Sequence, residues 1–320
     1  MGWLIVTFLL AATGTLVLGL LLRWVDRKVT AMVQWRVGPP WYQPAVDILK
    51  LMGKETLVPT TARGAGFLLV PVIALASTAV AAAVLWQTVI APQDTFIGDL
   101  IVVIYLLIIP AAMTILGASA SGNPHAAVGA SREIKLLMSY ELPMLLALLV
   151  AIIRAGWTLQ LGGIVAAQAE APFLFSISGA IAIIVAVLCT QAKLGQVPFD
   201  LAEAECEIMS GVYVEYSGPL LACWLMTRAM LLAIMPLLLI IVFWGGFTTA
   251  SLYSSSWWWG LLSFLGKYVL FVALVTLIRN TNPRLRIDQT LKFFWFGLTP
   301  IAVAAVILAL VGISRGIPWL

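Results

Sequence analysis

Long runs of apolar residues, nearly free of charge, recur along the whole chain. Most of them contain about 20 residues, which is the length that an α-helix needs to cross the hydrocarbon core of a bilayer. The pattern predicts an all-α, polytopic membrane protein that forms a single membrane domain, with helical segments in the inner-side loops. We expect eight transmembrane helices, at approximately residues 3–22, 65–90, 99–120, 136–155, 172–192, 219–243, 260–279 and 293–313.

The charge distribution predicts how these spans are oriented. Fourteen of the 18 Lys and Arg residues fall in the first, third, fifth and seventh loops. Because cytoplasmic loops carry an excess of Lys and Arg, we expect a multi-pass protein of the cytoplasmic membrane with both termini outside. Loops 23–63, 121–135, 193–217 and 279–292 would then lie inside. The net charge of +4 is a topology signal, and it gives no reason to expect nucleic-acid binding.

The first inner loop is long and has helical periodicity. It contains the amphipathic stretch WVDRKVTAMVQWR, a turn at Gly38-Pro39-Pro40 and a second amphipathic stretch, QPAVDILKLMGK. Such helices can lie in the plane of the membrane interface, or they can form a floor for a docked protein. Both interpretations remain open from the sequence.

The fifth loop is strongly acidic. It holds five carboxylates: Asp200, Glu203, Glu205, Glu207 and Glu215. If residues 199–216 formed one helix, four of these acids would share a face and Glu205 would point elsewhere. Gly211 is the position at which such a helix would be interrupted. A row of carboxylates can pass protons and attract cations, which suggests an ion path. The alternative is a solvated acidic cap on the loop.

Charged residues inside the spans are few and costly to bury. Glu141 lies within the fourth span in the sequence SYELP, and Asp99 opens the third span. We expect both to belong to the ion path, with Glu141 suited to shuttle protons because desolvation favours its neutral form. Arg228 and Lys267 are equally compatible with snorkelling or with a salt bridge between helices.

The sequence offers no ligand set for a metal or cluster. Cys189, Cys206 and Cys223 are scattered without a C-x-x-C pair, and the sole histidine, His125, has no partners in sequence. Glycine-rich nucleotide motifs and nucleophile elbows are also missing from the sequence. We therefore expect this chain to hold no cofactor, so that any redox centre would belong to another subunit.

Several motifs occur in the order found in one known family. They are Asp26-Arg27-Lys28, RVGP at Arg36–Pro39, Gln43-Pro44, KETLVP at Lys54–Pro59, Ser139-Tyr140-Glu141, the acidic AEAECEIMSGVYVEYSG and PRLRIDQ. On these motifs the chain resembles the core membrane subunit that links the redox arm to the ion-pumping arm of respiratory complex I. The resemblance covers essentially all eight predicted spans.

Three features depart from complex I itself, and the third of them resembles the equivalent subunit of energy-converting [NiFe] hydrogenases and formate hydrogenlyase more closely. Only Pro40, Trp41 and Tyr42 separate Gly-Pro from Gln-Pro in the first loop, the third loop reads GASREIK, and VPFDLAEAE precedes the acids. A shortened first loop argues against a quinone tunnel. The alternatives are the equivalent subunit of a quinone-, methanophenazine- or sulfur-reducing complex, and a free-standing ion-coupled transporter.

The hydrogenase resemblance implies the partners of this chain. Hydrogenase large and small subunits and Fe–S subunits, carrying the Ni–Fe site and the clusters, would dock on the inner face, and antiporter-like subunits would lie alongside in the bilayer. Charged loop residues would organise the loops or hold the partner: Arg27, Arg36, Arg132, Glu133, Arg284, Arg286 and Asp288.

Overall fold

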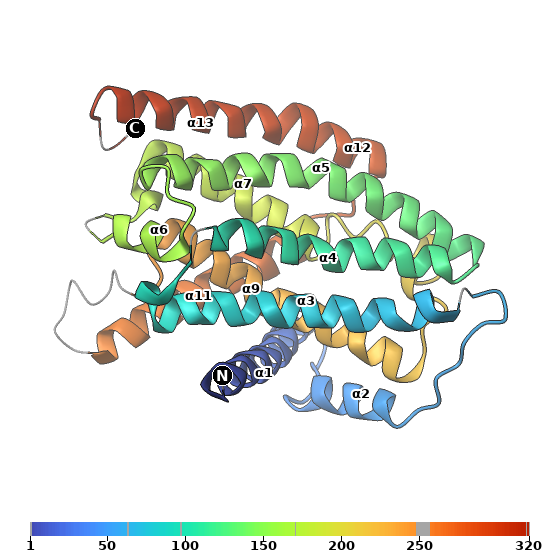
Figure 1. The fold of residues 1–320 in the computed structure, drawn as a ribbon. Coiled ribbons are helices and arrows are strands. Elements are labelled where there is room, and N and C mark those ends of the chain that lie inside the picture. Colours follow the sequence, from blue (N-terminus) through green and yellow to red (C-terminus); the bar gives the residue numbers. More distant parts are fainter. Residues whose placement is uncertain are drawn as a thin grey trace.

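The computed structural model describes residues 2–62, 64–96, 98–169, 171–247, 257–317 and 319, and every regular element in these ranges is helical. Figure 1 shows long helices lying side by side, with the short α2 at the edge of the bundle. Seven segments within the described ranges are long and apolar enough to cross a membrane. They are α1 (Gly2–Val33), α3 (Gly64–Ile90), α4 (Asp99–Ala120), α5 (Pro124–Arg154), α9 (Gly218–Trp244), α11 (Trp257–Thr281) and the segment Ile287–Ser314. The all-α, polytopic fold is confirmed.

The fifth expected span corresponds to a shorter helix. α7 (Ile177–Lys193) follows the 3-10 turn η2 (Phe173–Phe175) and has 17 residues, which gives a length of about 26 Å at 1.5 Å per residue. This length is at the lower limit for a membrane-crossing helix. α7 packs against α5, α9 and α13, so its place in the bundle agrees with the predicted span. Its passage through the whole bilayer remains a prediction.

Three helices extend beyond the expected spans. α1 continues to Val33, so the amphipathic stretch expected after the first span is part of the same helix. α5 begins at Pro124, where the Asn123 side chain accepts a hydrogen bond from the His125 backbone N–H, and most of the expected third loop is helical. The last span begins early, with α12 (Ile287–Lys292), the π-helical η4 (Phe293–Leu298) and α13 (Thr299–Ser314) following one another. Hydropathy marks the membrane layer, and a helix can continue past it.

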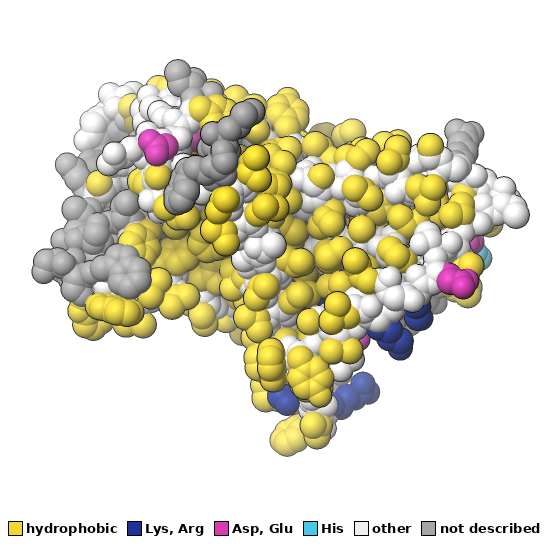
Figure 2. Space-filling model, turned by 60° about the horizontal axis from the view of Figure 1, so that its bottom comes forward, with side chains coloured by type: hydrophobic (Ala, Val, Ile, Leu, Met, Phe, Trp, Pro, Cys, Tyr) yellow, Lys and Arg dark blue, Asp and Glu magenta, His cyan; other side chains and the backbone are white. Residues whose placement is uncertain are grey.

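The remaining elements are short. α2 (Gln43–Met52) confirms the second helix expected in the first inner loop. η1 (Pro92–Asp94) and α6 (Leu161–Ala167) lie at the end of the bundle away from α2. On the face shown in Figure 2, hydrophobic side chains cover most of the bundle, and Lys and Arg side chains gather on one side of it.

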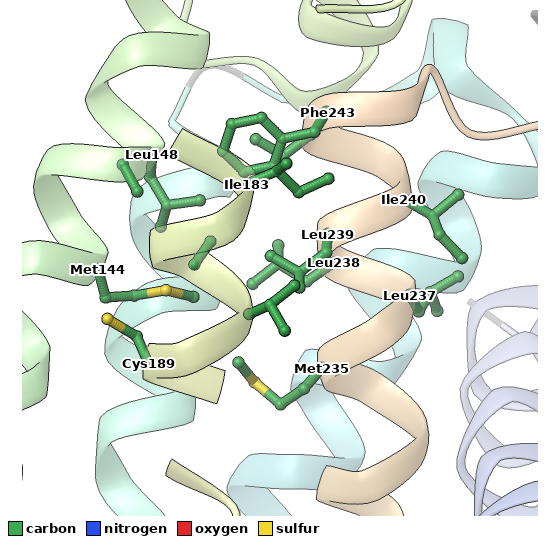
Figure 3. Close-up of a cluster of buried hydrophobic side chains, with 14 of the residues drawn as sticks. Met144, Leu148, Ile183, Cys189, Met235, Leu237, Leu238, Leu239, Ile240 and Phe243 are labelled. Atoms are coloured by element: carbon green, nitrogen blue, oxygen red, sulfur yellow. The ribbon is translucent and has the colours of Figure 1, made fainter. Parts of the chain in front are cut away.

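The core of the bundle is organised around α9. Its side chains from Ala229 to Phe243 are all buried, and it contacts α1, α3, α7 and α11. Figure 3 shows side chains of α5, α7 and α9 interdigitating. Close approach is achieved with small residues, as is usual between membrane helices: a β-carbon at Gly19 of α1 would lie 2.1 Å from the Ala229 carbonyl oxygen.

The first, third, fifth and seventh loops meet at one end of the bundle, which we call the loop end. The Leu57 N–H donates to Ser217 Oγ at 3.0 Å, and Thr61 Oγ1 donates to the Ser121 carbonyl at 3.2 Å. The Leu285 N–H donates to the Pro198 carbonyl at 3.0 Å. These bonds join all four loops into one surface. The cytoplasmic location of this surface remains a prediction, and Arg63, at the end of the first loop, lies outside the described residues.

Candidate ion-coupling site

The acidic loop, residues 194–217, folds into short turns between α7 and α9. α8 (Glu205–Ile208) ends after four residues because residues 209–211 all adopt left-handed backbone angles, with φ of 51°, 72° and 51°. The 3-10 turn η3 (Gly211–Tyr213) follows. A β-carbon at Gly211 would lie 1.9 Å from the Ala202 carbonyl oxygen, so this turn requires glycine. A single helix over residues 199–216, with four acids in a row on one face, is therefore wrong.

The acidic side chains of this loop bind different partners. Arg228 of α9 donates to Glu203, Arg284 after α11 donates to Asp200, Arg132 of α5 donates to Glu207, and Asn123 donates to Glu215, each at 2.5 Å. The side chain of Glu205 lies outside the described residues. The loop is thus tied to α5, α9 and the seventh loop through charge-assisted hydrogen bonds, which are stronger than neutral ones.

A charged cavity of about 370 Å³ lies between the acidic loop, α1, α9 and α11. Its charged lining consists of five arginines and three carboxylates: Arg23, Asp26, Arg27, Asp200, Glu203, Arg228, Arg279 and Arg284. Within this lining, Arg279 donates to Asp26 and so links α11 to α1. Buried charges are stable when they face each other or water, and a polar cavity of this size has room for several water molecules.

The protonation of Glu203 is subject to opposing electrostatic influences. Burial raises the pKa of the Glu203 carboxyl; the nearby Arg228 guanidinium opposes this effect, and Asp200 adds to it. Opposing influences of this kind make the protonation of an acid sensitive to small changes in its surroundings. Glu203 can therefore respond to a change of charge near the loop end.

A second, smaller cavity connects this region to α5. It has a volume of about 50 Å³ and shares Asp200, Glu203 and Arg228 with the charged cavity. Glu133 of α5 and Lys193 of α7 also line it. This volume exceeds the roughly 10–15 Å³ that one water needs. We expected Glu133 among the residues that organise the loops or hold the partner, whereas the structure places it in the wall of this internal cavity.

Glu141 lies further along α5, at the α7 interface. Its Oε2 is 3.4 Å from Nζ of Lys193, the last residue of α7, and both side chains are largely buried. Its other oxygen, Oε1, is buried and has no hydrogen-bond partner among the described residues. The arrangement brings Glu141 to the same lysine that lines the smaller cavity.

Comparison with known proteins agrees with these features. A family model described as NADH dehydrogenase matches residues 5–310 of the chain. The chain belongs to this family. It is 33% identical to the H subunit of the NADH-quinone oxidoreductase of Anoxybacillus flavithermus over 312 residues, which cover 94% of this chain and 90% of that protein. It is 31% identical to the same component of the Carboxydothermus hydrogenoformans enzyme over 330 residues, covering 97% and 91%.

A solved structure shares the fold. A chain in the membrane-bound sulfane sulfur reductase, an archaeal respiratory membrane complex, superposes with a TM-score of 0.85 at 30% identity, covering 97% of this chain and 100% of that chain. The resemblance to the core membrane subunit of complex I and its relatives is therefore confirmed. This NADH dehydrogenase family member is a complex I-like, multi-pass membrane subunit.

The family motifs lie at different distances from the charged cavity. Arg27, from the first motif, lines the cavity and donates to Asp47 of α2 at 3.0 Å. Arg36, Arg286 and Asp288 are exposed at the loop end, as a docking role requires, and that role remains a prediction.

Asp99 does not join the other acids. It is buried at the start of α4, about 33 Å along that 22-residue helix from the loop end.

Sequence reasoning missed four residues of this family member's site and left Arg228 undecided. Arg23, Lys193 and Arg279 lie at or next to the ends of apolar spans and were counted only as topology signals, and Asp26 was noted only as part of a motif. Arg228 was flagged as a charge within a span but had no assigned partner. The sequence did contain a signal for these residues. Charged side chains of opposite sign at matching depth on α1, α9 and α11 need partners in a membrane.

Proposed function

We propose that this chain is the membrane-anchor and ion-coupling subunit of an energy-converting [NiFe] hydrogenase complex. It would link electron transfer in a redox module docked on the loop end to the translocation of H⁺ or Na⁺. The observation that carries the proposal is the charged cavity, because it joins the acidic loop to three helices through groups that can exchange protons. By this proposal the Fe–S clusters and the Ni–Fe site belong to partner subunits and this chain holds no cofactor.

The charged cavity itself does not suit a quinone. Five arginines and three carboxylates line it, whereas the head and tail of a quinone would need mostly apolar walls with a few placed polar groups. Within the first inner loop, the segment between the Gly-Pro and Gln-Pro motifs is also short, because residues 40–42 alone separate them. Both features favour water and ions as the occupants of the cavity.

A sulfur-reducing complex is the second candidate. The observation that favours it is the sulfane sulfur reductase neighbour, whose chain matches this one over its entire length. The two candidates require the same membrane subunit and differ in the docked catalytic subunit. A free-standing transporter is disfavoured because the loop end presents a broad, charged surface with exposed apolar side chains, including Trp35, Val37 and Trp41.

Purification of the native complex through a tag on this chain tests the proposal. We expect a catalytic subunit with two C-x-x-C pairs to co-purify, and the complex to evolve hydrogen from a reduced low-potential donor. Sulfide production without hydrogen evolution would select the second candidate. Quinone reduction by the complex, or transport activity by the isolated chain, would refute both.

A further inference from the structure

Lys193 occupies an unusual position for a lysine. Its side chain is 5% exposed, its Nζ lies 3.4 Å from Glu141, and it stands over the ring of Tyr140 at 5.5 Å from the centroid. A buried ammonium is stable only when it is paired or hydrogen-bonded. Glu141 and the aromatic face supply this stabilisation in the conformation that the structure shows.

A second group of carboxylates lies within reach of the same side chain. Lys193 lines the smaller cavity together with Glu133 and Glu203. Glu133 and Glu141 are eight residues apart on α5, which corresponds to about 12 Å along the helix axis. Lys193 reaches α5 from the end of α7, and its flexible four-carbon stem carries three rotatable donors. Lys193 and Glu133 therefore border one cavity, which gives the ammonium a path from Glu141 toward the second carboxylate of α5.

The pair with Glu141 leaves hydrogen-bonding capacity unused. Glu141 Oε1 and the Tyr140 hydroxyl are buried without a hydrogen-bond partner among the described residues. One hydrogen bond from Lys193 is present within the described part of the chain, and it goes to Glu141. A partly satisfied buried pair is less firmly fixed than a fully bonded network, so this contact is suited to breaking and re-forming.

We propose that Lys193 is a tethered cation that alternates between Glu141 and Glu133 and carries the charge state of the acidic loop into the membrane-embedded part of α5. This inference deepens the proposed ion-coupling function and does not depend on which electron acceptor the complex uses. Lys193 lies outside the family motifs of the sequence. The proposal gives it the role of transmitting charge between the two cavities and the α5–α7 interface.

The cycle is balanced in protons. While Glu133 is protonated, Lys193 pairs with the ionised Glu141. When Glu133 releases its proton to cavity water, the ammonium moves toward Glu133, and Glu141 takes up one proton from water, because desolvation favours the neutral carboxyl. When Glu133 regains a proton from cavity water, Lys193 returns to Glu141 and Glu141 releases its proton. Each of the two carboxyls therefore gains and loses one proton per cycle.

A static salt bridge that merely fixes α5 to α7 is the alternative, and a set of four complexes separates the two. We would compare wild type, Lys193→Gln, Glu141→Gln and the double variant, each as the intact complex in closed vesicles, and measure the charge translocated per electron. The double variant leaves no unpaired buried charge, so it is expected to assemble. If Lys193 moves, the double variant stays uncoupled, with translocation lower by roughly fivefold or more, the lower end of usual coupling effects. Wild-type coupling in the double variant would overturn the proposal.

Infrared difference spectroscopy during turnover gives a readout that a structural role would not move. The proposal predicts a carbonyl band of a protonated carboxylic acid that appears and disappears in wild type and is lost in Glu141→Gln. In Lys193→Gln the Glu141 carboxyl should stay protonated, so the band should be lost from the difference spectrum and remain in the absolute spectrum. An unchanged band in Lys193→Gln would contradict the tethered cation even if that variant assembled poorly.

The Glu203→Gln variant, measured in parallel, distinguishes failure of this inference from failure of the proposed function. Full translocation by Glu203→Gln would refute the ion-coupling role of the site itself. Loss of translocation in Glu203→Gln together with wild-type coupling in the Lys193/Glu141 double variant would refute the tethered cation alone.

Discussion

Two ion pairs of the acidic loop form a matched experiment on how burial sets electrostatic strength. Arg228–Glu203 and Arg132–Glu207 have the same chemistry and the same 2.5 Å separation. Their exposures differ: the side chains of the first pair are 28% and 24% exposed, whereas Glu207 in the second is 60% exposed. The two pairs should therefore contribute differently to the stability of the complex.

The expected magnitudes follow from solvent screening. Exposed pairs have coupling energies of about 0.2–1 kcal/mol, and breaking a buried pair by removing one partner costs about 3–5 kcal/mol. With about a quarter of each side chain exposed, Arg228–Glu203 lies between these limits, and we expect a coupling energy of about 2 kcal/mol. Arg132–Glu207 should give less than about 1 kcal/mol.

Double-mutant cycles measure these energies directly. Arg228→Gln, Glu203→Gln and the double variant form one cycle, and Arg132→Gln, Glu207→Gln and their double variant form the control cycle. The free energy of unfolding of the detergent-solubilised complex is the quantity to compare. Equal coupling energies in the two cycles would refute the reasoning from burial.

The same arginine determines a pH dependence. Burial raises the pKa of Glu203 above its ordinary value, so at a pH between the ordinary and the raised pKa the folded chain holds a proton that the unfolded chain has already released. The stability from this proton is fully present below the ordinary pKa and is lost as the pH rises through the raised pKa. Arg228→Gln removes the influence that opposes burial, so the pH at which Glu203 ionises, and at which translocation rises, should shift upward. An unchanged pH profile of translocation would contradict this assignment.

Three further predictions concern the turn, the topology and the docking surface. Gly211→Ala should reduce stability and translocation because the new β-carbon meets the Ala202 carbonyl. The control variant Gly195→Ala, at a residue with φ of +59° and open space around it, should cost only about 1–2 kcal/mol of stability. Equal losses in the two variants would contradict this reasoning. Single cysteines at the exposed positions Asp94 and Leu49 should react with a membrane-impermeant maleimide from opposite sides of the membrane, and labelling from one side would refute the topology. The Val37 side chain is 98% exposed, and Val37→Asp should release the redox module from this chain on gel filtration of the solubilised complex. Full retention of the redox module by the variant would refute docking at Val37.

Hydropathy predicted the helices well because a membrane leaves few choices. A backbone inside the hydrocarbon layer must satisfy its own hydrogen bonds, so every long apolar run becomes a helix. The same signal could not locate the helix ends. Arg23, Asp26 and Arg27 continue α1 beyond the apolar layer, and residues 124–135 begin α5 before it, because charged side chains are compatible with helix once water or ion-pair partners are available.

The site was predicted in part, since the sequence identified the acids but gave them the wrong arrangement. A helical face was expected, and the left-handed turn at residues 209–211 breaks it. The Ser210-Gly211 pair is a turn signal and marked where the helix could be interrupted, but it did not give the conformation of the loop around it. The partners were out of reach because they come from distant positions: Glu203 pairs with Arg228, 25 residues away, and Asp26 with Arg279, 253 residues away.

The change from a row of acids to a set of ion pairs alters how coupling can work. A row of free carboxylates would pass protons along one helix face. The observed pairs join the acidic loop to α5, α9 and the seventh loop, so protonation of one acid frees an arginine that belongs to another element. A charge change under the docked module would then redistribute pairing across several elements at once. Coupling over such a distance requires an element with two arrangements. The ion pairs around the two cavities provide several candidates, and among them the Lys193–Glu141 pair joins α7 to α5.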